Sequence, residues 1–285
     1  MQRIAFYGKG GIGKSTIATG VSYHLAHADR KLLHVGCDPK ADSSLVLVKD
    51  QERFRTVIGQ SFQIDPEDLE AEDLIMEGIH PNIECIESGG PEAGVGCGGR
   101  AVSKSFEIFD ELEIVDESLY DAAVFDVLGD VVCGGFAAPM RKAHGSKVCI
   151  ILSEEMMACY AANNIAKACR RYADNGICLA GLVVNLRSNE ADLAPIQRFA
   201  DAIGTRILQV IPRDPIVGEA ELFRKSVLEY APDSPVAVAI RELAEKVWSL
   251  DPASCPIPEP LEGDKVRDVM RGPMRADQMA RLSAK

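Results

Sequence analysis

The residues from Gly8 to Ser15 fit the phosphate-binding pattern G-x-x-x-x-G-K-[ST] and directly follow a short apolar run, Ile4–Tyr7. In such a loop, backbone amides curl around an anionic phosphate at the start of a helix. The Lys14 ammonium can reach the β and γ phosphate oxygens, and the Ser15 hydroxyl can bind Mg²⁺. The pattern therefore predicts a site for MgATP. Its expected nucleotide-binding residues are Gly8, Gly10, Gly11, Ile12, Gly13, Lys14, Ser15 and Thr16.

The same stretch also satisfies the dinucleotide-binding pattern G-x-G-x-x-G through Gly8, Gly10 and Gly13. A dinucleotide-binding turn has no use for lysine and serine directly after the third glycine, and its pattern is the less specific of the two. We therefore favour the phosphate loop over this alternative, and over a glycine turn that binds nothing. The loop also carries a second lysine, Lys9, at its entrance. This side chain can hardly serve its own phosphates, but it could reach those of a facing subunit across a dimer interface.

Two segments that contain aspartates follow predicted strands, one from Asp38 to Asp42 and one from Asp126 to Asp130. Open α/β sheets place such strand ends beside the phosphate loop. Asp38 could then orient an attacking water, and Asp42 or Asp126 could organise Mg²⁺. The second segment has a D-x-x-G sequence, whose glycine N–H can sense a γ-phosphate. A single aspartate at a strand end is more often a helix cap than a catalyst, but two such loops behind a phosphate loop favour an ATPase.

Two of the nine cysteines, Cys97 and Cys133, lie in glycine-rich loops that could bring backbone amides up to sulfur. Two thiolates cannot hold a cubane iron–sulfur cluster, which needs about four. A two-fold symmetric homodimer would supply the pair twice and place one [4Fe-4S] cluster on the axis. Cys133 lies three residues after Asp130, so movement of the phosphate-sensing loop would shift the cluster loop. From spacing alone, this hypothesis stands level with burial of both thiols in the apolar core, where free cysteine usually lies.

The composition is typical of a soluble cytoplasmic enzyme. The chain has 285 residues, of which 47% are hydrophobic and 26% charged, enough for one large α/β domain. A net charge of −12 argues against nucleic acid or an anionic membrane as the main partner. No apolar stretch approaches the roughly 18 residues of a membrane span, and the chain starts its first strand at once, so neither a transmembrane helix nor a signal peptide is expected. The cysteines form no C-x-x-C pair, which favours reduced cytosolic thiols.

Short apolar runs alternate with longer patterns of helical spacing along residues 1–250. Strands are predicted at Ile4–Tyr7, Leu32–Val35, Ile83–Ile86, Ala122–Val127, Val148–Leu152, Leu179–Val184 and Ile207–Ile211, and helices at Ser15–Ala28, Met156–Tyr172, Leu193–Ile203 and Ser234–Leu250. This alternation predicts an α/β fold with a mainly parallel, doubly wound sheet and helices on both faces, a P-loop NTPase. Residues 251–285 are expected to form a separate proline-rich strap and a polar C-terminal tail, because four prolines occur between positions 251 and 260.

Five segments of the chain together resemble the nitrogenase iron protein (dinitrogenase reductase) family, which carries a deviant Walker A loop. They are Tyr7–Thr16, Gly36–Ser43, Glu87–Cys97, Asp126–Phe136 and Glu155–Ile165, and the likeness runs from Ile4 to about Trp248. The resemblance implies a homodimeric ATPase with one bridging [4Fe-4S] cluster. It also implies an electron donor such as ferredoxin or flavodoxin, and a larger catalytic component, containing a metallocluster, that receives electrons as ATP is hydrolysed.

The resemblance also implies roles for single residues. By matching position, Lys9 would be a lysine that acts on the partner's nucleotide, Lys14 would bind phosphate and Ser15 would bind Mg²⁺. Asn185 and the turn formed by Pro212, Arg213 and Asp214 fall where the family contacts adenine.

The remaining implied roles concern nucleotide switching and electron transfer. The first switch would contain Asp38 and Asp42, and the second would be flanked by Asp126 and Asp130. Cys97 and Cys133 would be the cluster ligands, and Arg100 matches an arginine of the docking face that some members have ADP-ribosylated.

The chain departs from the familiar iron protein in residues 16–20, 97–101 and 141–144, and from Pro256 onward we find no close likeness. These departures spare the ATPase and cluster motifs but fall partly on the docking side, so the final substrate stays open: dinitrogen, a methylthio-alkane, a tetrapyrrole or another compound. Ala41 looks like nitrogenase and unlike the histidine of the tetrapyrrole reductases, which makes those less favoured. A rival from another class is a spatial-partitioning or scaffold ATPase of the same P-loop superfamily, which would have no use for the cysteine pair.

Overall fold

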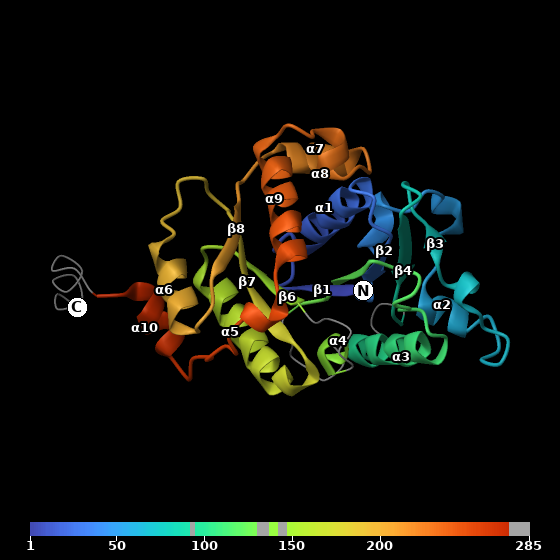
Figure 1. The fold of residues 1–285 in the computed structure, drawn as a ribbon, viewed down its shortest axis with the longest axis horizontal. Helices are drawn as coiled ribbons and strands as arrows, with labels where there is room; N and C mark the ends of the chain where they lie inside the picture. Colours follow the sequence, from blue (N-terminus) through green and yellow to red (C-terminus); the bar gives the residue numbers. More distant parts are fainter. Residues whose placement is uncertain (92–94, 130–136, 142–146, 274–285) are drawn as a thin grey trace.

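A computed structural model describes residues 1–91, 95–129, 137–141 and 147–273 of the chain; Asp130 and Cys133 lie outside these ranges. One eight-stranded sheet forms the centre of the molecule, in the order β3-β4-β2-β5-β1-β6-β7-β8 (Figure 1). The strands are β1 Gln2–Tyr7, β2 Leu32–Gly36, β3 Met76–Glu77, β4 Ile83–Glu87, β5 Ala122–Asp126, β6 Lys147–Leu152, β7 Cys178–Asn185 and β8 Ile207–Ile211.

Seven of these strands run parallel, as the sequence predicts. Every residue of β2, β5 and β6 is buried, which is the pattern expected when helices cover both faces of a parallel sheet. The two-residue strand β3 was not predicted. It pairs antiparallel with β4 at the edge of the sheet and is too short to show a periodic pattern.

Helices cover both faces of the sheet, which confirms the doubly wound α/β class (Figure 1). Helices α1, α7, α8 and α9 lie on one face, and α3, α4 and α5 lie on the other. The helices are α1 Lys14–His27, α2 Val57–Ser61, α3 Gly98–Glu111, α4 Ala138–Arg141, α5 Met156–Arg171, α6 Ala194–Ala202, α7 Ile216–Leu222, α8 Val227–Tyr230, α9 Pro235–Ser249 and α10 Lys265–Arg271. Within the described residues, no helix combines the length and the apolar composition needed to cross a membrane.

The register of the sheet brings four strand ends to one edge. Gly36 at the end of β2 is in register with Glu87 of β4 on one side and with Asp126 of β5 on the other. Asp126 is in turn in register with Phe6 of β1, one residue before the strand ends. Because these strands are parallel, the loops that follow them leave the sheet side by side. The phosphate loop and both aspartate segments therefore start from neighbouring positions.

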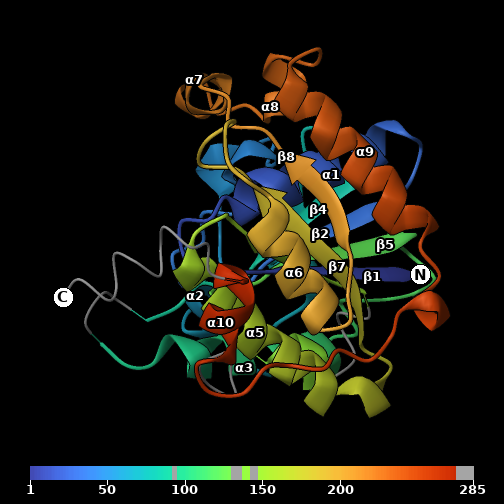
Figure 2. The ribbon, with the colours of Figure 1, turned by 90° about the vertical axis from the view of Figure 1, so that its left-hand side faces the viewer.

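The segment after α9 crosses the molecule and ends in α10, which packs against α5 and α6 (Figure 2). It is extended apart from a 3₁₀ turn at Pro252–Ser254. The buried Asn163 side chain of α5 holds it by two hydrogen bonds: its Nδ2 donates to the Leu261 carbonyl at 2.9 Å, and its Oδ1 accepts from the Leu261 amide at 2.8 Å. This strap is thus fastened to the domain through its backbone.

We expect Asn163→Ala to lower the free energy of unfolding by about 1–3 kcal/mol, because it leaves two partly buried backbone groups of Leu261 without their partner. Lys167→Ala is the matched control, since it breaks an exposed ion pair of 3.6 Å between the same helix and Glu262 of the strap and should cost at most about 0.5 kcal/mol. Urea denaturation and hydrogen exchange of the Leu261 amide measure both effects. Equal losses for the two variants would contradict this account of the strap.

Candidate functional site

The phosphate loop between β1 and α1 depends on two glycines that approach other groups closely. Gly8 has φ 152°, and a Cβ at this position would lie 2.2 Å from the Ile151 carbonyl oxygen. Gly13 has φ 93°, and a Cβ there would lie 2.4 Å from Nδ2 of Asn185. Any side chain at either position would push the loop off the sheet. The loop therefore has one compact path, as a phosphate cradle requires.

The two lysines of the loop differ in their surroundings. Lys14 is buried, and its Nζ donates to the Lys9 carbonyl oxygen at 3.3 Å, so the ammonium lies across the inside of the loop. The Lys9 side chain is exposed at the entrance. The division between a lysine for its own nucleotide and a lysine for a facing one stays a prediction.

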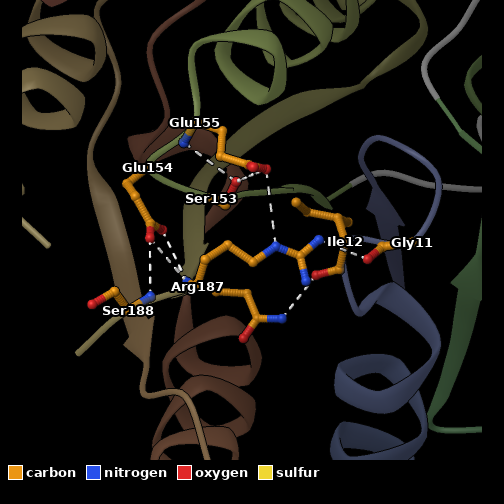
Figure 3. Close-up of polar contacts among 8 residues, drawn as sticks. Gly11, Ile12, Ser153, Glu154, Glu155, Arg187 and Ser188 are labelled. Atoms are coloured by element: carbon orange, nitrogen blue, oxygen red, sulfur yellow. Dashed lines mark hydrogen bonds and ion pairs between the residues drawn. The ribbon is translucent and has the colours of Figure 1, made fainter. Parts of the chain in front are cut away.

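Two side chains from the end of β7 brace the loop, as Figure 3 shows. Asn185 Nδ2 donates to the Ile12 carbonyl at 2.8 Å, and Arg187 donates to the Gly11 carbonyl at 2.9 Å. Glu154, which follows β6, accepts hydrogen bonds from the backbone amides of Arg187 and Ser188 at 3.0–3.1 Å. The neighbouring strand ends thus hold the phosphate loop through its carbonyl groups, which leaves its amides available to an anion.

A cavity of about 410 Å³ adjoins the first turn of α1. It brings together the residues predicted for the adenine side, Asn185, Pro212, Arg213 and Asp214, with Gly13 and Thr16 of the phosphate-loop motif. Asn189 holds the turn in place, because its Oδ1 accepts from the Arg213 amide at 2.8 Å and its Nδ2 donates to the Arg213 carbonyl at 2.9 Å. A second cavity of about 580 Å³ lies on the other side of Thr16, lined by Ser15 and Asp42 among others.

The segment Asp38–Asp42 after β2 folds into a tight turn. The Asp38 carboxylate accepts from the Lys40 amide at 2.9 Å, and Ala41 has φ 52°, a backbone conformation that alanine rarely adopts. The Lys40 ammonium lies 3.5 Å from the Asp38 carboxylate and 3.9 Å from that of Asp42. Lys40 is largely exposed, so both ion pairs are weak and readily exchanged.

Asp126 ends β5 with its side chain 3% exposed. Oδ2 accepts a hydrogen bond of 2.6 Å from the Ser43 hydroxyl, whereas Oδ1 is buried without a well-formed hydrogen bond from any described residue. The Ser15 hydroxyl lies nearby. Burial raises the pKa of Asp126, and the neighbouring hydroxyls of Ser15 and Ser43 and the Lys14 ammonium oppose this rise. A spare buried carboxylate oxygen beside a serine hydroxyl and a phosphate loop fits the ligand chemistry of Mg²⁺.

Behind Asp126, a buried histidine extends the polar contacts into the core. The two ring nitrogens of His34 lie 2.9 Å from the hydroxyls of Ser22 on α1 and Ser43. Burial lowers the pKa of His34 to about 3, so the ring is neutral at neutral pH. Because Ser43 donates to Asp126, its oxygen is left to accept, and Nε2 of His34 therefore carries the ring proton.

A second buried carboxyl group, Glu87, lies across β2 from Asp126. Its Oε1 accepts from the Ser44 amide at 2.6 Å, and Oε2 has no hydrogen-bond partner among the described residues. The carboxyl group fills the place where a side chain of Gly36 would be, since a Cβ there would lie 2.0 Å from Oε2. Burial raises the pKa of Glu87 to about 8, which makes this group a neutral acid at neutral pH.

Cys97 lies directly before α3 with its thiol exposed, unlike Cys37, Cys85, Cys149, Cys159 and Cys169, which are buried. The start of a 14-residue helix carries partial positive charge, which favours a bound anionic group at this place. Arg100 is exposed one turn into α3 and lines, with Cys97, an apolar cavity of about 420 Å³. Among the described residues of one chain, no three metal-ligating side chains come together. The exposed Cys97 thiol is suited to be a single ligand of a cluster. The other ligands would have to come from outside the described residues of this chain.

A model of the family described as 4Fe-4S iron sulfur cluster binding proteins, NifH/frxC family, matches residues 2–274. The chain belongs to this family. This confirms the resemblance drawn from the phosphate loop, the aspartate segments and the cysteine loops.

Solved structures of other P-loop proteins show the same fold at low sequence identity. The septum site-determining protein MinD from Pyrococcus horikoshii OT3, complexed with Mg-ADP, is 24% identical over 87% of this chain and 97% of its own, with a TM-score of 0.69. A ParA family ATPase from Chlorobium tepidum TLS is 20% identical over 86% and 98%, with a TM-score of 0.63. Cobyrinic acid a,c-diamide synthase from Mycobacterium smegmatis, with bound ADP and magnesium, is 16% identical over 86% and 93%, with a TM-score of 0.61.

Sequence reasoning missed several polar residues of this NifH/frxC-family site: Glu154 and Arg187, which brace the phosphate loop, and the buried His34 and Glu87. Glu154 and Arg187 follow strands at the same sheet edge as the aspartates, so their position was a usable signal. His34 and Glu87 lie within strands, where nothing in the sequence separates them from solvent-facing polar residues.

The raised pKa of Glu87 gives a test of this buried site. The folded chain keeps a proton that an unfolded carboxyl loses above its ordinary pKa of 4.5, so the stability that this proton contributes is lost as the pH rises from about 4.5 to about 8. We expect Glu87→Gln to reduce the loss of unfolding free energy between pH 5 and pH 8 by on the order of 2–4 kcal/mol. Guanidinium denaturation at several pH values measures this, with the exposed Glu67→Gln as control. An unchanged pH dependence in Glu87→Gln would show that the carboxyl is ionised.

Proposed function

We propose that this chain is the ATP-hydrolysing iron–sulfur component of a nitrogenase or nitrogenase-like reductase. The observation that carries the proposal is the position of Cys97: an exposed thiol at a helix start, on the same sheet edge as the phosphate loop and the Asp38–Asp42 segment. An ATPase without a redox centre has no use for this arrangement. Membership in the NifH/frxC family supports the same function.

In this proposal, each polar group of the edge has one task. The loop amides and Lys14 bind the β and γ phosphates, while the Ser15 hydroxyl and the free oxygen of Asp126 hold Mg²⁺ and its water shell. Asp38, at the start of the first aspartate segment, orients the attacking water and accepts its proton. Asp130 would flank the second switch.

A homodimer completes the site in this proposal. Lys9 projects from the loop entrance and stabilises the phosphate charge of the facing subunit as the dimer closes. Cys97 and Cys133 of both subunits would hold one [4Fe-4S] cluster, which, when bound, accepts an electron from a ferredoxin or flavodoxin and passes it on.

We further propose that the larger catalytic component, which contains a metallocluster, docks at the face that carries Cys97 and Arg100. The apolar cavity between α2 and α3 lies beside both residues, and Phe62 at its rim is 82% exposed. The substrate of that component would be dinitrogen or a methylthio-alkane in preference to a tetrapyrrole, on the strength of Ala41.

The alternative function is spatial partitioning or scaffolding by an ATPase that dimerises over ATP. The fold similarity to MinD and to a ParA family ATPase favours this candidate. It assigns no role to Cys97, whose exposed thiol would then be a liability. Iron content separates the two candidates.

We expect the anaerobically purified dimer to be brown and to hold about four irons. Cys97→Ser and Cys133→Ser should each abolish the cluster, because thiolates are the iron ligands. The chain should stay folded and bind nucleotide, because the core formed by the described residues contains neither Cys97 nor the residues directly before it. Cys255→Ser, a change at another thiol that is not buried, should keep the iron. Iron analysis and visible absorption measure the result. An iron-free wild-type chain after anaerobic reconstitution would reject the electron-transfer function in favour of the alternative.

The two lysines of the loop should separate binding from hydrolysis. Lys14→Ala should lose nucleotide affinity by about tenfold or more, because it removes the buried ammonium that lies inside the loop. Lys9→Ala should bind MgATP with near-normal affinity but hydrolyse it poorly and fail to reduce its partner. Calorimetric binding and phosphate release measure the two steps. Normal hydrolysis and electron delivery by Lys9→Ala would exclude a role across the interface.

A further inference from the structure

Pro39, the second residue of the Asp38–Asp42 segment, packs into a notch between Gly90 and Gly98. Gly90 lies in the connection between β4 and α3, and Gly98 is the first residue of α3. The segment 88–98, which carries Cys97, is called the Cys97 loop. A Cβ placed on Gly90 would lie 2.5 Å from Cβ of Pro39, and one placed on Gly98 would lie 2.8 Å from its Cγ. Real side chains essentially never approach so closely, so the absence of a side chain at both glycines is what admits the proline ring. Gly98 directly follows Cys97.

The base of the Cys97 loop is fixed to the sheet. The Ser88 amide donates to the Gly36 carbonyl at 2.8 Å, and the Ile58 amide donates to the Ser88 carbonyl at 3.1 Å. The Thr56 side chain fills the space beside Gly89, where a Cβ would lie 2.5 Å from it. These contacts hold the first part of the loop to β2 and α2 and do not involve the nucleotide.

The segment that carries Pro39 is held much more weakly. Its two aspartates are joined through the exposed Lys40 at 3.5 and 3.9 Å, and Ala41 occupies an unfavourable backbone conformation. Mg²⁺ would compete with Lys40 for these carboxylates, and a γ-phosphate would compete with the carboxylates for the Lys40 ammonium. Either exchange would let this turn relax. Pro39 is therefore a rigid group on a segment that would respond to nucleotide. Its ring packs against Gly98, the residue directly after Cys97.

We propose that Pro39 is a positioning residue that transmits movement of the Asp38–Asp42 segment to the Cys97 loop through the Gly90 and Gly98 notch. This inference rests on the proposed function for its biological meaning, but the contact itself involves no iron. It gives the nucleotide a path to the first cluster cysteine that runs through packed atoms of the first aspartate segment. The D-x-x-G segment, by contrast, is joined to Cys133 along the chain.

The notch allows a test by complementary substitution. Pro39→Ala removes the ring atom that faces Gly98 and leaves a gap, so it should uncouple the segment from Cys97. Adding Gly98→Ala in the same chain places a new Cβ 3.6 Å from Cβ of residue 39, an ordinary van der Waals distance. The double variant should therefore restore the contact from the other side.

The readout is the rate at which iodoacetamide alkylates Cys97, followed by peptide mass spectrometry on protein stripped of iron, with and without a non-hydrolysable MgATP analogue. The analogue should change the wild-type rate by about fivefold or more, the size of a typical coupling between sites. Pro39→Ala should bring this ratio close to one while nucleotide affinity is kept, and the double variant should recover it. Pro81→Ala, at an exposed turn before β4, is the control and should behave as wild type. On iron-loaded protein, the analogue should change the rate of iron capture by a chelator in the wild type, the double variant and Pro81→Ala, and should leave it almost unchanged in Pro39→Ala.

An unchanged ratio in Pro39→Ala would overturn the proposal. So would a loss that the double variant does not repair, because it would place the effect in the backbone of the segment. A rate of Cys97 alkylation in the wild type that does not change when the nucleotide analogue is added would overturn it as well. The alkylation assay needs no cluster. A chain that never binds iron would thus contradict the proposed function and still show whether Pro39 couples nucleotide to Cys97.

Discussion

The Asp126 carboxylate is buried at the centre of the sheet edge. Among the described residues, one of its oxygens accepts a hydrogen bond and the other has no hydrogen-bond partner. An ionised group in such a place costs several kcal/mol unless other groups compensate. The neighbouring groups are arranged accordingly: Ser43 donates to Asp126, His34 is neutral and orients Ser43, and Glu87 two strands away keeps its proton. A divalent cation at the free oxygen would complete this compensation. Nucleotide binding and the stability of the edge are thus parts of one electrostatic balance.

The site also depends on side chains that pack closely against glycines of neighbouring segments. Asn185 fills the space beside Gly13, Glu87 fills that beside Gly36, and Pro39 fills the notch at Gly98. In each case, a side chain of one segment fills the space that a side chain at the glycine of another segment would need. Such contacts are stiff, because neither partner can move without a clash or a void. Asn185 thus packs the phosphate loop against the end of β7, and Pro39 packs the first aspartate segment against the residues on either side of Cys97.

The sequence predicted the seven longer strands and the helices α1, α5, α6 and α9, because buried parallel strands and amphipathic helices leave strong patterns along the chain. It did not predict α3, although this helix has 14 residues. It also placed the phosphate loop, Asp38 and Asp126, since strand ends in such a sheet share one edge. It did not reveal Glu87 or His34, whose chemistry arises from burial among residues distant in sequence. Pro39 was visible only as part of a motif, because its partner glycines lie some fifty residues further along and their proximity is a matter of tertiary packing.

The strap that ends in α10 has a practical consequence for attaching this protein to a surface. The last described residues lie beside α6, at the end of the molecule opposite α2 and α3 (Figure 1). Asn163 and Arg198 hold this segment to the domain, so a pull on the C-terminus is borne by α5 and α6 and not by the sheet edge. A chain tethered to an electrode through its C-terminus would therefore present α3 and Cys97 away from the support. The far face, with Cys97 and Arg100, would then stay open to a diffusing protein.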